Sequence, residues 1–307
     1  MRKVLAVVGP TASGKTRISI ELANKLNGEI ISADSRQVYK HIPISTSQPS
    51  KEDVKHVNHH FINELEPDSE FNAGEFGLRA REIINQVFSK GKQPIIVGGS
   101  GLYIRSLIDG FFEKDIDSKE IRDYLYKKYE LFGDKHLYDE LKNIDEEIHS
   151  EIPPGKIRRV IRALEVYYAT GKKISELQNE NVKVDFRTVQ TGLMYDRKIL
   201  YRRINDRVDE MITNGLIEEV KWLKENNYDY RKNYSIDTVG IKEVYKYLES
   251  EYDYDEMISM IKQNTRRYAK RQMTWFRKDM RINWITIDEE SDNTVIVNKV
   301  LDVFSNS

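Results

Sequence analysis

The chain contains no cysteine, which excludes disulfides, thiol nucleophiles and cysteine-ligated zinc. It also lacks any apolar run approaching the ~18 residues that a membrane-spanning helix needs. No internal repeat or low-complexity tract interrupts its 307 residues, of which 39% are hydrophobic. Together these absences predict a soluble, ordered, cytoplasmic protein that needs neither a membrane nor covalent staples to fold.

An excess of charge of either sign is lacking as well, because 49 basic residues nearly cancel 50 acidic ones. The charges are segregated along the chain, however. Residues 262–281 carry eight basic side chains against Asp279, and residues 154–173 carry six against Glu165. Two such stripes indicate either local phosphate-binding surfaces or two ordinary solvated helices. Charge alone leaves both interpretations open.

Short apolar segments alternate with helical ones along most of the chain. The segments predicted as strands are 4–8, 29–32, 93–97, 189–194 and 282–287. The segments predicted as helices are 15–26, 74–89, 158–169, 197–213 and 255–278. This alternation predicts an α/β fold with a parallel sheet flanked by helices, like that of the phosphate-loop NTPases.

The character of the sequence changes after Phe112. From about residue 115 the chain is highly charged and helical, and no convincing strand appears before Val189. We therefore predict that residues 1–114 and 187–307 form the α/β catalytic core. Residues 115–186 are expected to form an inserted, all-helical subdomain.

The phosphate-binding loop motif is matched in full by Gly9-Pro10-Thr11-Ala12-Ser13-Gly14-Lys15-Thr16, between a predicted strand and a predicted helix. Its glycines let backbone N–H groups surround an anion at the positive end of the helix. Lys15 would supply a charge to the phosphate, and Thr16 a hydroxyl ligand for Mg²⁺. The motif predicts a phosphate or nucleotide site without saying whether the phosphate is transferred or leaves.

Asp34 follows a predicted strand, at the sheet edge where parallel sheets bind ligands. Its carboxylate could act as a general base, cap the next helix or hold Mg²⁺ through water. The strand at 93–97 runs into Gly98-Gly99, where phosphate-loop ATPases place a metal-binding aspartate. This departure weakens the prediction of an ATPase.

Five further strings closely resemble the tRNA dimethylallyltransferases, also called tRNA isopentenyltransferases. The strings are Asp34-Ser35-Arg36-Gln37-Val38-Tyr39, residues 97–104, residues 158–166, Asp196-Arg197 with residues 200–204, and residues 268–277. The resemblance spans residues 3 to about 281. Its first and last strings are far more specific than the phosphate loop.

The resemblance implies that a dimethylallyl group passes from dimethylallyl diphosphate to N6 of the adenosine 3′-adjacent to a tRNA anticodon, assisted by Mg²⁺. It implies that Asp34 is the general base. It further implies that residues 9–16 hold the diphosphate, that Lys15, Thr16 and Arg197 stabilise its charge, and that Thr16 binds the metal. The alternative for Arg197 is an ion pair with Asp196.

The implied partners are the tRNA anticodon stem-loop and dimethylallyl diphosphate, and no obligate protein partner is evident. The helical insertion is expected to contact the stem-loop. The residues implied to bind tRNA are Asp34, Ser35, Arg36, Gln37, Ser100, Arg122, Arg158, Arg159, Arg162, Thr238, Gly240, Lys242, Lys270, Arg271, Gln272 and Arg277. Both basic stripes contain members of this set.

Some positions depart from the family pattern or invite a second interpretation. Gln48 replaces a lysine, residues 153–156 replace a His-Pro-Asn-Asp string, and Ile241 replaces a tyrosine that could stack. We expect these changes to alter the tRNA preference rather than the activity. His59-His60 lacks a third metal ligand nearby and is expected to be structural or to contact substrate. Trp275 and Phe276 are expected to pack in the core.

Three other functions stay open on the residues themselves. The first is an ATP-dependent kinase acting on a small molecule or a nucleotide, and the second is an isopentenyltransferase acting on free adenine nucleotides. Both share the phosphate loop, but both leave the basic stripes without a purpose. The third is a non-catalytic RNA-binding module, which the presence of Lys15, Thr16, Asp34 and Arg197 together disfavours.

Overall fold

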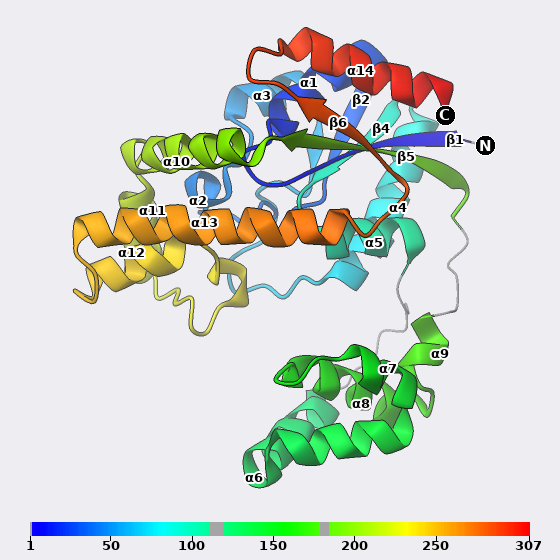
Figure 1. Cartoon of the computed structure of the whole chain (residues 1–307), viewed down its shortest axis with the longest axis vertical. Coiled ribbons are helices and arrows are strands. Elements are labelled where there is room, and N and C mark those ends of the chain that lie inside the picture. Colours follow the sequence, from blue (N-terminus) through cyan, green and yellow to red (C-terminus); the bar gives the residue numbers. More distant parts are fainter. Residues whose placement is uncertain (1, 111–118, 179–183) are drawn as a thin grey trace. The chain divides into compact units, whose positions relative to one another are not determined.

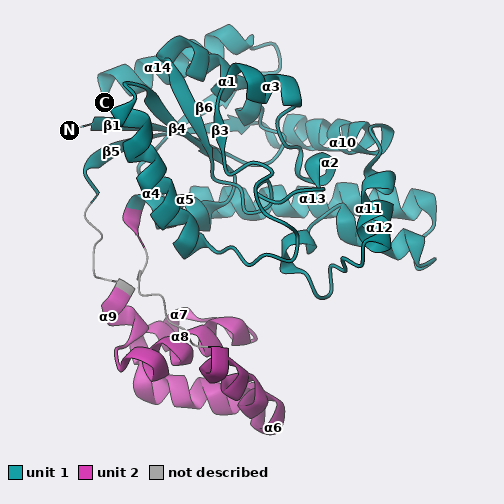
Figure 2. Cartoon of the chain, turned by 180° about the vertical axis from the view of Figure 1, so that it is seen from behind, with its two compact units in different colours: residues 1–108, 184–307 teal, residues 109–183 magenta. Residues whose placement is uncertain are grey.

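The structure is a computed structural model that describes residues 2–110, 119–178 and 184–307 (Figure 1). The chain divides into two compact units, Met1–Ile108 with Val184–Ser307 (unit 1) and Asp109–Lys183 (unit 2) (Figure 2). The boundary expected after residue 114 lies outside the described residues. At the other end the division falls at 183–184, against the 186–187 expected from the sequence.

Unit 1 is built on a parallel sheet with the strand order β3-β2-β4-β1-β5-β6. The strands are β1 (Arg2–Val8), β2 (Gly28–Ser32), β3 (His59–His60), β4 (Gln93–Gly98), β5 (Phe186–Tyr195) and β6 (Ile282–Ile287). The predicted parallel α/β fold is confirmed. Strand β3 was not predicted, because a strand of two residues has no periodicity to detect.

Helices cover both faces of this sheet. The helices of unit 1 are α1 (Lys15–Leu26), α2 (Pro43–Thr46), α3 (Lys51–His56), α4 (Ala73–Ser89), α5 (Gly101–Asp109), α10 (Arg197–Thr213), α11 (Leu216–Glu225), η1 (Tyr234–Ile236), α12 (Ile241–Leu248), α13 (Tyr254–Phe276) and α14 (Asn293–Asn306). Both views show α1 and α14 on one side of the sheet and α4 and α5 on the other (Figures 1 and 2).

Alternation along the central strand explains the main core. Leu5 and Val7 of β1 point to the same face, since successive side chains of a strand alternate. There they join Leu22 of α1 and Val297 of α14 in one buried cluster. Burial of such aliphatic side chains contributes roughly 1.5–3 kcal/mol each. The cluster fixes α1, and with it the phosphate loop, against the sheet.

Unit 2 is a small helical bundle with a core of its own. Its helices are α6 (Lys119–Ile144), α7 (Glu146–Glu151), α8 (Ile157–Thr170) and α9 (Ile174–Gln178). Leu125, Leu141 and Leu164 are fully buried between α6 and α8. The buried carboxylate of Asp145 accepts the backbone N–H groups of Ile148 (3.3 Å) and Ser175 (3.0 Å), which caps two helix starts. Within the described ranges of the whole chain, no helix combines the length and apolar character that crossing a membrane requires.

Residues 153–156 and Ile241, two of the departures from the family pattern, have structural roles. Tyr138 Oη donates to Pro153 O (2.6 Å) and accepts from Lys156 N (3.1 Å), which holds the turn before α8. Ile241 is fully buried. The position of Ile241 therefore faces the core, and its identity changes packing rather than an exposed stacking surface.

A buried glutamate ties three strands of the sheet together. Glu29 in β2 accepts hydrogen bonds from His60 of β3 (2.8 Å), from Lys92 before β4 (2.9 Å) and from Asn58 (2.8 Å). Burial alone would raise the pKa of Glu29, but these donors outweigh it and hold the pKa at about 2. His60 is thus a hydrogen-bond partner of this carboxylate. No group of three or more His, Asp or Glu side chains suited to a metal occurs in the described residues.

Replacing Glu29 by glutamine should lower the free energy of unfolding at pH 7 by about 1–3 kcal/mol, because Lys92 loses its buried counter-charge and His60 and Asn58 lose their carboxylate acceptor. The pKa of Glu29 is lowered on folding from 4.5 to about 2. Its contribution is therefore full above about pH 4.5 and is lost as the pH falls toward 2. Urea unfolding of wild type and E29Q between pH 7 and pH 3.5 measures this convergence. The exposed Glu52→Gln is the control, and equal stability of E29Q and wild type at pH 7 would contradict the prediction.

Candidate active site

The phosphate loop connects the carboxyl end of β1 to the first turn of α1. Gly14 caps the helix with φ +81°, a conformation that glycine adopts without strain. A Cβ on Gly9 would lie 2.8 Å from Leu193 O of β5, so only glycine lets the loop run this close to the sheet. The loop therefore sits where α1 presents its unpaired N–H groups and the positive end of its dipole.

Lys15 folds back over the loop. Its Nζ donates to Pro10 O (2.7 Å) and lies 3.5 Å from Ser13 Oγ. Burial, and then the charge of the nearby Arg207, lower the pKa of Lys15 to about 7, although Asp34 opposes both effects. The lysine is thus held beside positive charge, and a bound phosphate would favour its charged form.

Gln272 of α13 joins the phosphate loop to the loop after β4. Its Oε1 accepts from Thr11 N (2.9 Å) and its Nε2 donates to Gly99 O (3.0 Å). A Cβ on Gly99 would lie 2.3 Å from that Nε2. The glycine found where an ATPase has its metal-binding aspartate is therefore needed for α13 to approach.

Asp34 lies two residues beyond the end of β2. Its Oδ1 accepts from Arg36 N (2.9 Å), which fixes a tight turn, while Oδ2 has no hydrogen-bond partner in the described part of the chain. Ser100 Oγ accepts from Ser35 N (3.1 Å) and steadies the same turn. Burial, and then the charge of Asp34, raise the pKa of Tyr268, which places that tyrosine in the same neighbourhood. Asp34 thus caps a turn with one oxygen and offers the other.

Two arginines that the sequence analysis passed over flank the loop. Arg203 Nε donates to Ala12 O (2.9 Å), and Arg207 Nε donates to Ser47 Oγ (2.9 Å). Burial lowers the pKa of Arg207, and Asp34 is the nearest opposing charge. Both residues lie one position before the buried Ile204 and Val208, so the i, i+4 spacing was the available signal.

Arg197, the arginine singled out from the sequence, has different surroundings. It is exposed at the start of α10, and its guanidinium lies 5.1 Å from the centre of the Tyr201 ring. Asp196 caps the helix through Lys198 N (2.8 Å) and makes no ion pair with Arg197 in the described chain. No contact ties Arg197 to the described phosphate loop, so its role in stabilising the diphosphate charge stays a prediction.

Two glutamines hold the segment after Asp34 in place. Gln37 accepts from Ser32 Oγ (2.9 Å) and donates to Thr46 O (3.2 Å) and Ser47 O (3.1 Å). Gln48, which replaces the family's lysine, donates to the carbonyls of Gln37 (2.9 Å) and Tyr39 (2.8 Å). The side-chain amides of both glutamines thus hold the segment after Asp34 through hydrogen bonds to its backbone.

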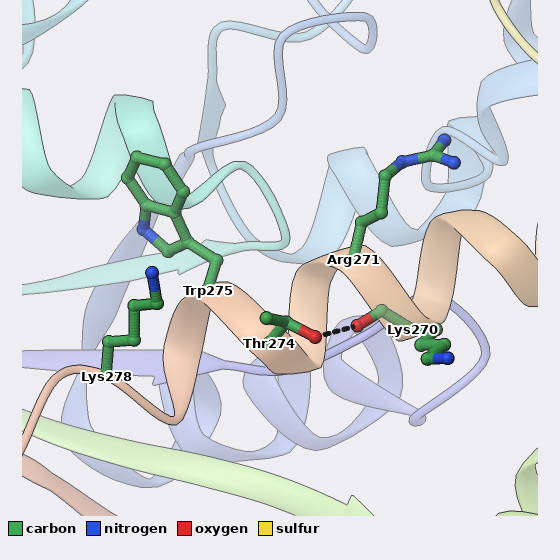
Figure 3. Close-up of a pocket in the computed structure, with 5 residues that line it drawn as sticks. All are labelled: Lys270, Arg271, Thr274, Trp275 and Lys278. Carbon is green, nitrogen blue, oxygen red and sulfur yellow. Dashed lines mark hydrogen bonds between the residues drawn. The ribbon is translucent and has the colours of Figure 1, made fainter. Parts of the chain in front are cut away.

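The carboxyl-terminal half of α13 presents a basic pocket of about 250 Å³. It is lined by Lys270, Arg271, Thr274, Trp275 and Lys278, with Trp275 and Lys278 at one end and Lys270 and Arg271 at the other (Figure 3). The expectation that Trp275 is a core residue was wrong, because it is 37% exposed. Its ring packs on Gly101, where a Cβ would lie 2.1 Å away, and the rest stays open. Phe276 is buried as predicted.

The remaining residues predicted to bind tRNA differ in how far they are free. Lys242 pairs with Asp237 (2.9 Å), while Arg277 is exposed. Gly240 caps the start of α12 with φ +95°, and Thr238 lies in the turn before it.

In unit 2, Arg122 and Arg162 pair with the buried Glu165 at 2.8 and 3.1 Å. Arg158 and Arg159 are exposed and have no ion-pair partner in the described residues.

A model of the IPP transferase family matches residues 37–279. This chain belongs to that family. The tRNA dimethylallyltransferase of Thermoanaerobacter sp. (strain X514) is 44% identical over 292 residues, covering 94% of this chain and 92% of that protein. The enzyme of that name from Halothermothrix orenii is 44% identical over 287 residues, covering 92% and 87%. The matched range begins after the phosphate loop, so the loop and the family model are separate observations.

Solved structures agree with this membership. The full-length tRNA isopentenylpyrophosphate transferase from Bacillus halodurans is 37% identical, with a TM-score of 0.73 and coverage of 100% of this chain and 98% of that one. A eukaryotic dimethylallyltransferase acting on tRNA is 30% identical, with a TM-score of 0.84 and coverage of 100% and 80%. The shared fold extends over the whole length of the present family member.

Binding of inorganic diphosphate at pH 8 should take up close to one proton at Lys15. The free lysine has a pKa of about 7, and the anion raises it by favouring the charged form. Affinity should therefore be highest below pH 7 and fall as the pH rises through the pKa of the bound lysine. Calorimetry in buffers of different ionisation enthalpy counts the protons.

The matched control is Lys15→Arg, whose side chain stays charged throughout this range. The variant should bind diphosphate without the lysine's share of the uptake. Equal proton numbers for wild type and K15R would show that Lys15 is already charged in the free protein.

Proposed function

We propose that the protein transfers a dimethylallyl group from dimethylallyl diphosphate to N6 of the adenosine 3′-adjacent to the anticodon in tRNA. The products are N6-isopentenyladenosine and diphosphate, and the tRNAs are those that read codons starting with U. One observation carries the proposal: a phosphate loop and an aspartate with an unpartnered oxygen lie together at the carboxyl edge of the sheet in a member of the IPP transferase family. Because tRNA is the acceptor, the protein acts in the cytoplasm.

The loop side of the site stabilises the leaving group. As the allylic C–O bond breaks, positive charge develops on carbon and negative charge on the diphosphate. Lys15, Arg203 and Arg207 are already in place before the substrate binds, together with the N–H groups at the start of α1. Donors fixed in advance need no reorganisation as charge develops, which is how such sites lower a barrier.

A Mg²⁺ ion fits the donors present at the start of α1. Thr16 offers an exposed hydroxyl, and the described residues hold no cluster of acidic side chains that would bind the ion apart from phosphate. Thr16 would thus hold the ion together with the diphosphate. When bound, the ion would neutralise part of the charge on the leaving group.

Asp34 serves the acceptor side. The lone pair on N6 of adenine is delocalised into the ring, so nitrogen becomes nucleophilic only as its proton is removed. Oδ1 of Asp34 is held by Arg36 N, which leaves Oδ2 to accept that proton. Lys15 and Arg207 lie close enough to interact electrostatically with the Asp34 carboxylate. The carboxylate that would accept the N6 proton is therefore also coupled to the cations that would hold the diphosphate.

Exposed basic side chains are the contacts proposed for the tRNA backbone. In unit 1 they are Lys270, Arg271 and Arg277 on and after α13, and in unit 2 they are Arg158 and Arg159 on α8. These cations have no ion-pair partner in the described residues, so they can neutralise phosphates without first breaking an ion pair. The kinase alternative leaves these surfaces unused.

Changing Asp34 to asparagine should lower kcat for prenyl transfer to unmodified tRNA by about 10²–10⁴-fold, because the amide cannot accept the N6 proton. The KM for dimethylallyl diphosphate should change little. Labelled dimethylallyl diphosphate with purified tRNA measures the transfer. Asp288→Asn is a matched control, since Asp288 also follows the carboxyl end of a strand and is exposed. Wild-type protein that labels free adenine nucleotides but not tRNA would overturn the proposal.

Arg207 and Arg197 of α10 have different surroundings, and the two should therefore differ in their effect on activity. Arg207→Ala should reduce kcat/KM for dimethylallyl diphosphate by about 10–100-fold, as expected for a lost charge-assisted hydrogen bond. Arg197→Ala should have the smaller effect, because its guanidinium lies over Tyr201. Steady-state kinetics at saturating tRNA compare the two variants. A larger loss for Arg197→Ala than for Arg207→Ala would show that Arg197 is the more important of the two in stabilising the diphosphate charge.

A further inference from the structure

Arg36 links the turn at Asp34 to η1, a segment almost two hundred residues later. Its backbone N–H donates to Asp34 Oδ1 (2.9 Å), and its Nη2 donates to Asp237 O (3.3 Å). The guanidinium lies over the ring of Tyr234, 4.2 Å from the ring centre. Arg36 therefore connects the ring of Tyr234, through its side chain, to Asp34, through its backbone.

Tyr234 is exposed although the residues that follow it are buried. It presents 64% of its surface to solvent, whereas Ser235 and Ile236 are buried. The hydroxyl of Ser235 donates to Pro67 O and anchors the backbone of η1. The hydroxyl of Tyr234 has no hydrogen-bond partner in the described chain. The anchored backbone of η1 and the Arg36 guanidinium on one face thus hold the ring of Tyr234, while much of its remaining surface is exposed to solvent.

The guanidinium of Arg36 is incompletely satisfied. Its Nη1 is buried, yet it donates to no acceptor in the part of the chain that the structure describes. Burial raises the pKa values of Tyr39 and Tyr103, and the charge of Arg36 opposes both shifts, so both tyrosines lie in its neighbourhood. A buried donor without an acceptor is rare in folded proteins and points to a partner that arrives with a ligand.

We propose that Arg36 and Tyr234 form a stacking platform for the nucleobase next to the target adenosine. This inference rests on the proposed function. Extruding the target adenosine from the anticodon loop removes the stacking of its neighbour. An exposed tyrosine ring replaces that stacking, as aromatic and arginine planes do for single-stranded RNA bases. Arg36 Nη1 donates to an acceptor of the same nucleotide.

The test uses an anticodon stem-loop RNA with 2-aminopurine placed in turn on each side of the target adenosine. Wild-type protein should quench the fluorescence at one of these positions, because stacking on a ring quenches 2-aminopurine. Tyr234→Ala should abolish the quenching and raise both Kd and KM for the RNA by roughly 5- to 100-fold. Its kcat at saturating RNA and its KM for dimethylallyl diphosphate should stay near the wild-type values.

Two variants separate stacking from other effects. Tyr234→Phe keeps the ring and should retain the quenching and the affinity. Tyr254→Ala removes another tyrosine of unit 1, 45% exposed and in edge contact with Tyr247, and should behave like wild type. Thermal unfolding of each variant confirms that the fold is intact.

The outcomes distinguish this inference from the function beneath it. If Y234A binds and quenches like wild type while transfer to tRNA continues, the platform does not exist and the function stands. If Y234F fails like Y234A, the hydroxyl rather than the ring is used, and stacking is wrong. If wild-type protein transfers nothing to tRNA, the proposed function fails whatever Tyr234 does.

Discussion

The close approach of α13 to the carboxyl edge of the sheet is the constraint on which the site depends. The buried amide of Gln272 satisfies one backbone donor of the phosphate loop and one backbone acceptor after β4. It can do so only because Gly99 carries no side chain, and Trp275 one turn later packs on Gly101 for the same reason. A buried amide with both ends bonded is costly to move. The phosphate loop and the turn at Ser100 therefore hold one geometry.

The site built on that frame concentrates positive charge. Lys15, Arg203 and Arg207 surround the loop, and Asp34 is the acid that opposes them. Keeping these cations buried side by side has a cost in the free protein: burial first, and then the neighbouring cations, lower the pKa values of Lys15 and Arg207. Under the proposed function, an arriving diphosphate relieves this cost, so the same charges would favour the bound anion and the developing leaving group. Placing Asp34 within that field would then join leaving-group departure to proton removal.

Local sequence patterns predicted the parallel sheet, the long helices, the phosphate loop and the aspartate after β2. Each of these depends on a few consecutive residues with a fixed spacing. The i, i+4 spacing of Arg203 and Arg207 puts both on one face of α10, but it could not show that this face, rather than the one with Arg197, meets the loop, because packing decides that. Gln272 was expected to bind tRNA, and no local pattern indicated its two contacts with the loops, since both partners lie more than 170 residues away. Trp275 was placed in the core from its type, whereas Gly101 determines how it lies.

Counting charges along the sequence overstated the surface available to RNA, and the structure shows why. In the stripe at 262–281, Lys262 pairs with Asp209 and Arg266 donates to Asn205, so both hold α13 against α10. In the stripe at 154–173, Arg162 pairs with the buried Glu165 and helps to set α8 against α6. Such contacts fix the helices that carry the remaining cations. The arginines that contact other protein groups thus orient the exposed ones that we propose bind phosphate, and loss of either kind is expected to weaken RNA binding for different physical reasons.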